Sequence, residues 1–393
     1  MATWGSFLWG GFPWGGTNWG SPDPPPVLVP YTKQDIDDAL RGKTAARHVS
    51  YRYDLLDSSE RKIKTLTTVS DASIAMSAFA DIKKTAKFKL RDDPDINYAS
   101  HRIQPFFVLG MPDGSTREWP LGIFLLSSPK RQESNGYIYR DIEAYDGLQV
   151  LKDDKFENRY FVAAGTNYIT AIKTILTGAG ITKINLEAST LTLPAGIEFE
   201  PGATKLAAVG ALLDAINYIS LYVDPVGYYT SRTYVSATIR PVTYTYADDE
   251  LSVLYNGLTD ETDLFDVPNK FVAYTSNPDA SSLRSVYSNT NPLSQLSTVS
   301  RGRTITDVRK VDDIADQTSL DAYVARVAFE ASQVYGYITM QTAVMPFHDV
   351  NDVVRVEFSP LYINENFSET NWSFRLKAGE KMTHKLRRTV NIL

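Results

Sequence analysis

Between residues 48 and 150, apolar and polar residues alternate with a period of two, which is typical of half-buried β-strands. The clearest runs are HVSYRYDLL, ASIAMSA and TAKFKLR. Further on, Asn135 and Gly136 separate two such runs, and this dipeptide favours the tight turn of a β-hairpin. Residues 31–150 are therefore predicted to form an antiparallel β-barrel or sandwich with a short helix at its N-terminal end.

Apolar residues take helical spacing in two other parts of the first 240 residues. Thr32 and Asp35 fit a capping box at the start of the short helix, and Gly42 can end it. Residues 151–236 contain two runs at helical spacing followed by a hairpin. This segment is therefore predicted to be a small α/β insert.

Strand-like runs return over residues 237–393, with one long helix among them. Thr318 and Asp321 predict the capping box of that helix, and Gly336 is expected to end it. The order is thus a β-region, an α/β insert and a second β-region of similar size. We expect a mainly β fold in which two related antiparallel β-barrel domains flank a small α/β region.

The first thirty residues fit no regular element. Tryptophan recurs every five residues, each time followed by glycine, at Trp4, Trp9, Trp14 and Trp19. This period matches neither a helix nor a strand. Residues 22–30 are rich in proline and favour a semi-rigid polyproline tether. Because tryptophan is enriched at interface hot spots, residues 1–30 are predicted to be an extended arm that docks on this chain, a second copy or another protein. The alternative is a disordered terminus.

Composition narrows the classes of partner. The chain of 393 residues has no cysteine, which excludes disulfides and zinc sites built on thiolates. Its net charge is −6, whereas nucleic-acid-binding proteins usually carry a basic excess, so we expect no nucleic acid as a specific ligand. No run approaches the length of about 18 apolar residues that a membrane-spanning helix needs, and we expect no membrane span.

Residues that carry enzyme chemistry are sparse. Only four histidines occur, no two of them at metal-ligand spacing, and His348 beside Asp349 fits a structural pair better than half of a catalytic dyad. The acidic cluster Asp260–Asp266 fits a solvated turn better than a calcium loop, which needs a central glycine. We therefore predict no catalytic, cofactor-binding or metal-binding residue. The alternatives are a glycan hydrolase that uses a carboxylate pair and a receptor-binding protein that stacks aromatic rings on sugars.

A basic segment near residue 300 concentrates Arg301, Arg303 and Arg309 within a few positions. These side chains are candidates for charge pairs with acidic residues of a neighbouring subunit. A solvated hairpin explains the same pattern equally well, and both interpretations stay open.

Several runs together resemble one known family. They are HRIQPFFVLG, EWPLGIFLLSSPKR, RDIEAYDGLQVLKDDK, DLFDVPNKFVAYTSNPD, NPLSQLSTVSRGRTITDVRKVDDIADQTSLDAYVARVAFEASQVYG and TAVMPFHDVNDVVRVEF. This combination resembles the baseplate hub, or tail hub, proteins at the tail tip of siphophages and related prophages of Gram-positive hosts. The resemblance covers most of residues 45–390 and does not include the tryptophan arm.

The resemblance implies a fold shared with the hubs of contractile tails and with type VI secretion spikes. Three copies with two barrels each would form a trimeric, pseudo-sixfold ring that closes the tail tube. The implied role is structural and non-enzymatic, in the virion at the tail tip, after assembly in the host cytoplasm. The implied partners are two further copies in a homotrimer, a distal tail or tail tube protein, the tape-measure protein and a central fibre or tip protein.

Overall fold

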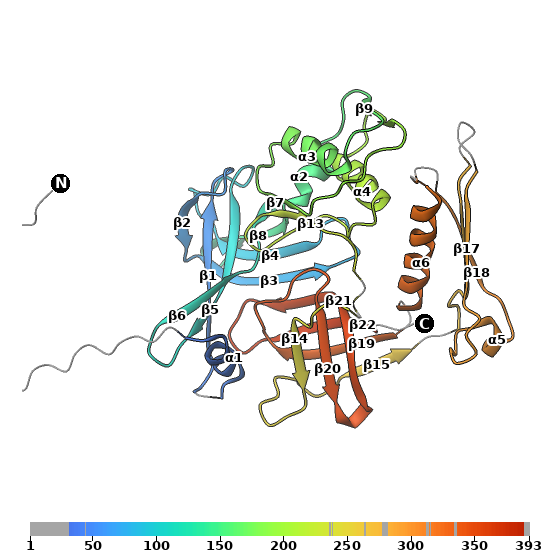
Figure 1. Ribbon diagram of the computed structural model, residues 1–393. Helices are drawn as coiled ribbons and strands as arrows, with labels where there is room; N and C mark the ends of the chain where they lie inside the picture. The colour runs from blue at the N-terminus through green and yellow to red at the C-terminus, as the bar shows by residue number, and fades with distance from the viewer. Residues whose placement is uncertain are drawn as a thin grey trace, which may run out of the picture.

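The computed structural model of the chain describes residues 31–43, 45–235, 237, 239–262, 265–276, 282–311, 314, 316–333 and 336–388. Strands dominate these residues, and the expected mainly β class with an α/β insert is confirmed. A large sheet forms the body, the insert lies against one side of it, and a small sheet with one helix lies at one end (Figure 1). No helix among the described residues has the length and apolar character needed to cross a membrane.

The large sheet contains fourteen strands from both ends of the chain. Its first half consists of β1 (His48–Leu56), β2 (Lys62–Leu66), β3 (Val69–Ser77), β4 (Lys84–Arg91), β5 (Arg102–Gly110), β6 (Thr116–Pro120), β7 (Phe124–Ser134) and β8 (Tyr137–Tyr145). Its second half consists of β14 (Tyr244–Ala247), β15 (Thr259–Thr262), β19 (Gly336–Ala343), β20 (Val353–Phe358), β21 (Ile363–Arg375) and β22 (Lys381–Arg388), with a 3-10 turn at Ser359–Leu361. The strand order is β15-β19-β22-β21-β3-β4-β8-β7-β5-β1-β2, while β6 pairs with β5, β20 with β21 and β14 with β20.

The two halves meet where β3 pairs antiparallel with β21. The register runs from Ser77 opposite Asn371 to Ser73 opposite Arg375. One continuous apolar core lies under both halves and reaches Leu40 of helix α1 (Lys33–Arg41). The expected capping box of Thr32 with Asp35 is present at the start of α1. The two β-regions are therefore hydrogen-bonded and packed to each other as one unit.

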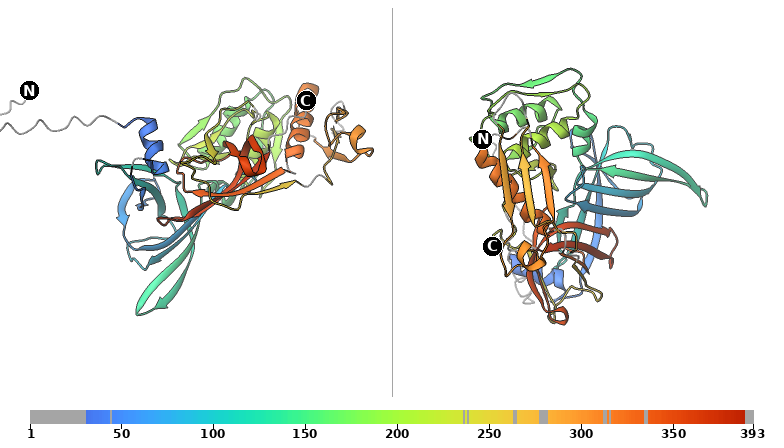
Figure 2. Two further views of the ribbon diagram at one scale, coloured as in Figure 1. Left: turned by 90° about the horizontal axis from the view of Figure 1, so that it is seen from below. Right: turned by 90° about the vertical axis from the view of Figure 1, so that its right-hand side faces the viewer.

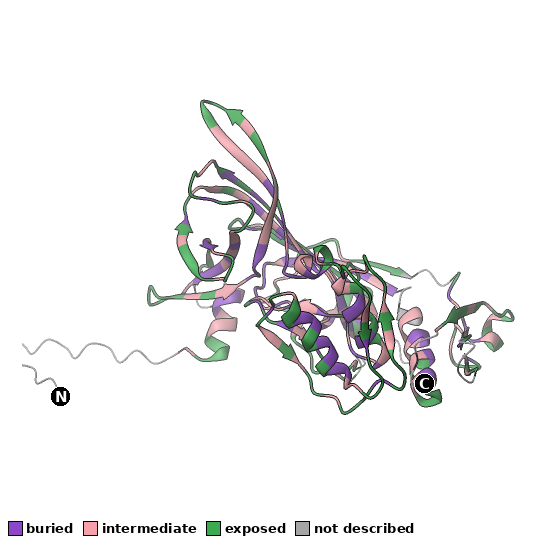
Figure 3. Cartoon of the chain, turned by 90° about the horizontal axis from the view of Figure 1, so that it is seen from above, coloured by how far each residue is buried: buried purple, intermediate pink, exposed green. Residues whose placement is uncertain are grey.

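The hairpin of β7 and β8 extends beyond this core. Asn135 and Gly136 both have positive φ, 53° and 79°, which is the backbone of the expected two-residue turn. Residues 130–137 are mostly exposed, and buried residues return only near the base of the hairpin (Figure 3). The outer part of the hairpin is thus a projection from the sheet, while its base contributes Phe124 and Ile142 to the core.

The insert has its own core. It consists of α2 (Leu148–Asp153), β9 (Tyr160–Val162), α3 (Tyr168–Gly178), β10 (Ile184–Leu186), β11 (Ile197–Phe199), α4 (Lys205–Ala215), β12 (Tyr222–Val223) and β13 (Tyr229–Ser231). Asn167 and Thr204 cap the two longer helices by accepting a backbone N–H three residues on. Ile172 and Leu213 are fully buried between these helices and the short strands. The α/β character expected for this segment is therefore present.

The small unit is built from β16 (Lys270–Tyr274), β17 (Arg284–Ser288), α5 (Thr298–Arg301), β18 (Thr306–Lys310) and α6 (Gln317–Gln333). Helix α6 lies between the body and the small sheet, so the opposite face of that sheet points outward (Figure 2). Two details of the long helix differ from our expectation. Its N-terminal cap is Asp316, which accepts from Ser319 N at 2.7 Å, and Gly336 begins β19 instead of ending the helix.

Candidate functional site

The residues expected at interfaces fall in two places. Trp4, Trp9, Trp14 and Trp19 lie outside the described residues. Arg301 donates to Val267 O at 2.7 Å, and both Arg301 and Arg303 donate to Phe265 O. These two arginines therefore fix the loop that precedes β16, and their contact with a neighbouring subunit stays a prediction.

Arg309 lies on β18 and pairs with Asp307 on the same strand at 2.9 Å. The two residues share one face of the strand because they are two positions apart. This face is covered by α6, whose Tyr323 is hydrogen-bonded to Arg309. Burial acts to lower the pKa of Arg309, but Asp307 and Tyr323 outweigh it and raise this pKa. Arg309 therefore does not lie on the outward face of the small sheet, and its role at an interface is untested.

The outward face of the small sheet carries an apolar row. Val272 lies opposite Val286 on one side and opposite Val308 on the other, so the three side chains share a face. Val286 and Val308 are 42% and 58% exposed. The row is flanked by basic residues, because Lys270, Arg284 and Lys310 occupy positions on the same face. This surface, which we call the open face, combines apolar and positive character without an acidic residue among its nine register positions.

The acidic clusters form contacts within the chain. Asp260 accepts from Arg388 at 2.8 Å, and Asp92 accepts from Arg140 at 2.8 Å. Asp266 is exposed, and Asp263 lies outside the described residues. Asp260 thus lies on β15 in an ion pair and not in a solvated turn, and the absence of a functional site among these carboxylates stays a prediction.

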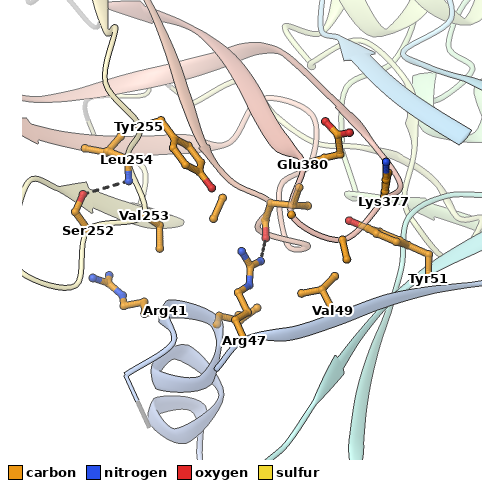
Figure 4. Close-up of a pocket in the computed structure, with 15 residues that line it drawn as sticks. Arg41, Arg47, Val49, Tyr51, Ser252, Val253, Leu254, Tyr255, Lys377 and Glu380 are labelled. Carbon is orange, nitrogen blue, oxygen red and sulfur yellow. Dashed lines mark hydrogen bonds between the residues drawn. The ribbon is translucent and has the colours of Figure 1, made fainter. Parts of the chain in front are cut away.

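A hollow of about 340 Å³ lies where α1, β1 and the turn between β21 and β22 meet (Figure 4). Arg47 donates to Val344 O in its wall, but its Nε is buried without a hydrogen-bond partner, as is the hydroxyl of Tyr51. Burial lowers the pKa of Arg47 and raises the pKa of Tyr51. The volume falls in the range of small-ligand pockets, and the hollow bridges the two halves of the large sheet.

The most unusual group is a polar cluster inside the second half of the sheet. Glu369 on β21 lies between two histidines, with Oε1 at 2.5 Å from His384 Nδ1 and Oε2 at 2.7 Å from His348 Nδ1. The outer nitrogens face hydroxyls, since His348 Nε2 is 2.7 Å from Tyr246 OH and His384 Nε2 is 2.9 Å from Thr342 Oγ1. All five side chains are buried. We call this group the histidine–glutamate cluster.

Burial and electrostatic attraction shift the pKa values of this cluster in opposite directions. Burial alone would raise the pKa of Glu369, but the two histidines outweigh it and lower this pKa to about 2. Burial acts to lower the pKa of both histidines, and Glu369 reverses the direction only for His348, whose pKa is raised. The carboxylate therefore stays ionised, and it needs positive charge from its neighbours.

A buried lysine links three parts of the molecule close to the cluster. Lys84 on β4 pairs with Asp349 at 2.6 Å and donates to Val223 O of the insert at 3.3 Å. Its backbone N–H donates to Asp146 at 2.7 Å. The ammonium group thus joins the first half, the insert and the second half. Asp349 pairs with Lys84, whereas its neighbour His348 pairs with Glu369, and the structural role expected for these two residues stays a prediction.

The chain was compared with known proteins through sequence and structure. No protein-family model matches it, and no curated protein matches it either. The tail protein of Neisseria meningitidis MC58 has 15% identity and a TM-score of 0.63, with 86% of this chain and 97% of that chain covered. The chain has the fold of phage tail proteins. The resemblance to tail proteins is thereby confirmed at the level of the fold.

Two further tail proteins share this fold across nearly their whole length. The 43 kDa tail protein of prophage MuSo2 from Shewanella oneidensis is 12% identical, with a TM-score of 0.62 and coverage of 86% of this chain and 99% of that chain. The prophage tail protein gp18 of Listeria monocytogenes EGD-e is 13% identical, with a TM-score of 0.53 and coverage of 87% and 96%. These tail proteins come from different bacteria, and the expected restriction to Gram-positive hosts stays a prediction.

Within this tail-protein fold, the histidine–glutamate cluster was missed by our sequence analysis. No two histidines lie at ligand spacing in the sequence, and the sheet brings together residues from four separate segments. A signal is nevertheless present in the alternation of the strands. His384 takes the inward position between Met382 and Leu386, and Glu369 follows the inward Phe367. Polar residues on the apolar face of a strand would have identified the cluster.

Proposed function

We propose that the protein is a structural hub of a phage or prophage tail. Three copies form a pseudo-sixfold ring that closes the tail tube at the tail tip of the virion, after assembly in the host cytoplasm. The observation that supports this is the likeness to the Neisseria tail protein, which extends over 97% of that protein and 86% of this chain. The role is non-enzymatic, and its chemistry is the burial of surface between subunits.

The partners follow from this role. Two further copies complete the homotrimer, a distal tail or tail tube protein lies on one side of the ring, and a central fibre or tip protein lies on the other. The tape-measure protein is held at the centre until ejection. Neither a specific nucleic-acid ligand nor a membrane span is part of the proposal.

The open face is one surface that a second copy can cover. Its apolar row provides area to bury, and Lys270, Arg284 and Lys310 suit a partner surface with acidic character. A second copy provides such character because the chain as a whole carries a net charge of −6. Together with Arg301, Arg303 and Arg309 in the same unit, this face makes the small unit the proposed site of subunit contact.

The native mass of the purified full chain tests the proposal most directly. We expect a trimer by light scattering or native mass spectrometry, and electron microscopy should show a ring with a central hole. A monomer at every accessible concentration, or a ring of any symmetry other than threefold, would contradict the hub.

A charge variant tests the open face. Val286→Glu places a carboxylate in the apolar row, and we expect it to weaken the trimer while the monomer stays folded. Val226→Glu is the matched control, since Val226 is 44% exposed in the insert and Val286 is 42% exposed. Equal trimer dissociation in both variants would remove the open face from the interface.

The arm is proposed to lock the ring or its attachment to the tail. Deletion of residues 1–21 should leave circular dichroism and thermal unfolding unchanged and should reduce assembly. Replacement of Trp4, Trp9, Trp14 and Trp19 by serine keeps the length of the arm and should have the same effect, because the tryptophans supply the buried area. Normal assembly of both variants would show that the arm has another role.

A further inference from the structure

Three potential metal ligands converge in the histidine–glutamate cluster. One ligand atom from each of His348, Glu369 and His384 lies within 4.8 Å of the other two. Glu369 and His384 have no exposed surface, and His348 is 5% exposed. Two imidazoles and a carboxylate are the donor set of many zinc sites, and ligand protons are absent when the metal binds.

The hydrogen bonds around His384 determine where its proton lies. Thr342 Oγ1 donates its single proton to Ala343 O at 2.9 Å. It therefore accepts from His384, and the proton of the imidazole is on Nε2. A neutral His384 then presents the lone pair of Nδ1 to Glu369 Oε1 at 2.5 Å. Two lone pairs at this distance repel each other, so either a second proton on Nδ1 or a metal cation lies between the two atoms.

The surroundings of His348 are a second, independent indication that a cation binds in the cluster. Its Nδ1 lies 2.7 Å from Glu369 Oε2, but both atoms are buried and neither meets the geometry of a hydrogen bond. A ring of ordinary hydrogen bonds would have satisfied this pair, because buried polar atoms are nearly always bonded. Its other nitrogen is held by Tyr246 OH at 2.7 Å, and a hydrogen bond to the free nitrogen fixes the ring orientation of metal-bound histidines in the same way.

We propose that His348, Glu369 and His384 bind one divalent transition-metal ion, with zinc as the preferred ion. Nitrogen and oxygen ligands at about 2.0–2.2 Å from zinc stand a little over 3 Å apart, so the two histidine–carboxylate contacts of 2.5 and 2.7 Å need to lengthen by less than about 1 Å. The two imidazole nitrogens, which lie on either side of the carboxylate, need to turn toward the same ion. The positive ion supplies the charge that the buried carboxylate needs. It ties β21 and β22 to the segment that follows β19, so its role is structural.

Metal analysis of the full chain tests the site. Protein prepared with a cleavable tag other than polyhistidine is stripped with chelator, dialysed against micromolar zinc chloride and analysed by mass spectrometry of the elements. We expect about one zinc per chain. His384→Gln should lose at least nine-tenths of it, and His48→Gln, which changes an exposed histidine, should retain it. Less than about one-tenth of an equivalent in the unaltered chain would overturn the proposal.

A second measurement keeps the proposal open to refutation if His384→Gln does not fold. The stripped unaltered chain is titrated with cobalt, and the visible absorption bands of four-coordinate cobalt should appear and saturate near one equivalent. Zinc should abolish these bands and raise the melting temperature above that of the stripped chain. Absence of the bands together with an unchanged melting temperature would show that protons alone hold the cluster. Neither result depends on trimer formation, so the metal site and the hub can fail separately.

Discussion

The two halves of the large sheet have different interiors. In the first half, aromatic rings meet edge to face, with Phe88 at 6.3 Å from Tyr53 and 6.1 Å from Phe124 between ring centres. The second half also buries Glu369, His348 and His384 among its apolar side chains. The comparison shows that one continuous sheet can be stabilised by two different kinds of interaction.

The difference has an energetic consequence. Apolar burial is non-directional, so the first half can adjust to small changes in side-chain volume. A buried carboxylate between two histidines depends on every partner, because the loss of one leaves the others desolvated and unpaired. The second half should therefore respond to substitution more sharply than the first.

The largest effect is expected for Glu369→Ala, which removes the centre of the polar cluster. We expect the free energy of unfolding to fall by about 4 kcal/mol, since two buried histidines lose their partner. Urea denaturation in the presence of chelator measures the protein contribution alone. Glu365→Ala, at an exposed position of the same strand, is the control and should cost less than about 1 kcal/mol. Equal losses would show that the buried cluster stabilises the fold no more than an exposed carboxylate does.

A pH dependence is expected at the border of the first half. Burial raises the pKa of Asp146 to about 6, although Lys84 and Leu148 donate backbone N–H groups to it. The unfolded chain has the lower pKa, so this group stabilises the fold fully below about pH 4 and loses that contribution as the pH rises through 6. The loss is about 3 kcal/mol. Asp146→Asn should remove this dependence of the free energy of unfolding on pH. An equal difference between pH 4 and pH 7 in the unaltered chain and in Asp146→Asn, measured by urea denaturation, would contradict the assignment.

Loss of the ion pair between Lys84 and Asp349, which links the first half of the sheet to the second, should lower the free energy of unfolding by an intermediate amount. Lys84→Met keeps the length of the side chain but removes the pair with Asp349, and we expect a loss of about 2 kcal/mol. Lys87→Met on the same strand is the control because its side chain is 76% exposed. Thermal unfolding should also become less cooperative in Lys84→Met, as the insert loses one contact with the body. A loss as small as that of the control would show that Asp349 is stabilised by other groups.

The smallest effect is expected inside the apolar half. Ile74→Val on β3 removes one methyl group from a fully buried position, and the cost should be about 1 kcal/mol. Ile338, at a fully buried position of β19, allows the same change in the second half through Ile338→Val. Urea denaturation should give similar small values for both, because the contrast lies in the polar groups and not in the apolar ones.

Local structure could be predicted from the sequence where a few neighbouring residues determine it. The capping box of Thr32, the turn at Asn135 and Gly136 and the alternation of β1 each depend on contacts within a short segment. The start of α6 was misplaced because Asp316, three residues before Ser319, is as good a cap as Thr318. Such errors are limited to the ends of elements.

Long-range structure could not be predicted in the same way. Nothing in the sequence of β3 specifies that its partner is β21, because alternation determines which face is buried but not which strand lies beside it. The histidine–glutamate cluster depends on that same pairing of distant strands. The sequence alone shows that Glu369 and His384 take inward positions on their strands. Their contact with each other and with His348 could be seen only in the folded structure.

The pairing of β3 with β21 also bears on the order of synthesis. Ser77 leaves the ribosome 294 residues before its partner Asn371, as their register shows. At about 5–20 residues per second, the edge of β3 waits on the order of 15–60 seconds for its neighbour. During that time an alternating strand with buried Ile74 and Met76 has a free edge, which is a template for aggregation. Nascent chains of this protein should therefore depend on chaperone protection until the last strands are translated.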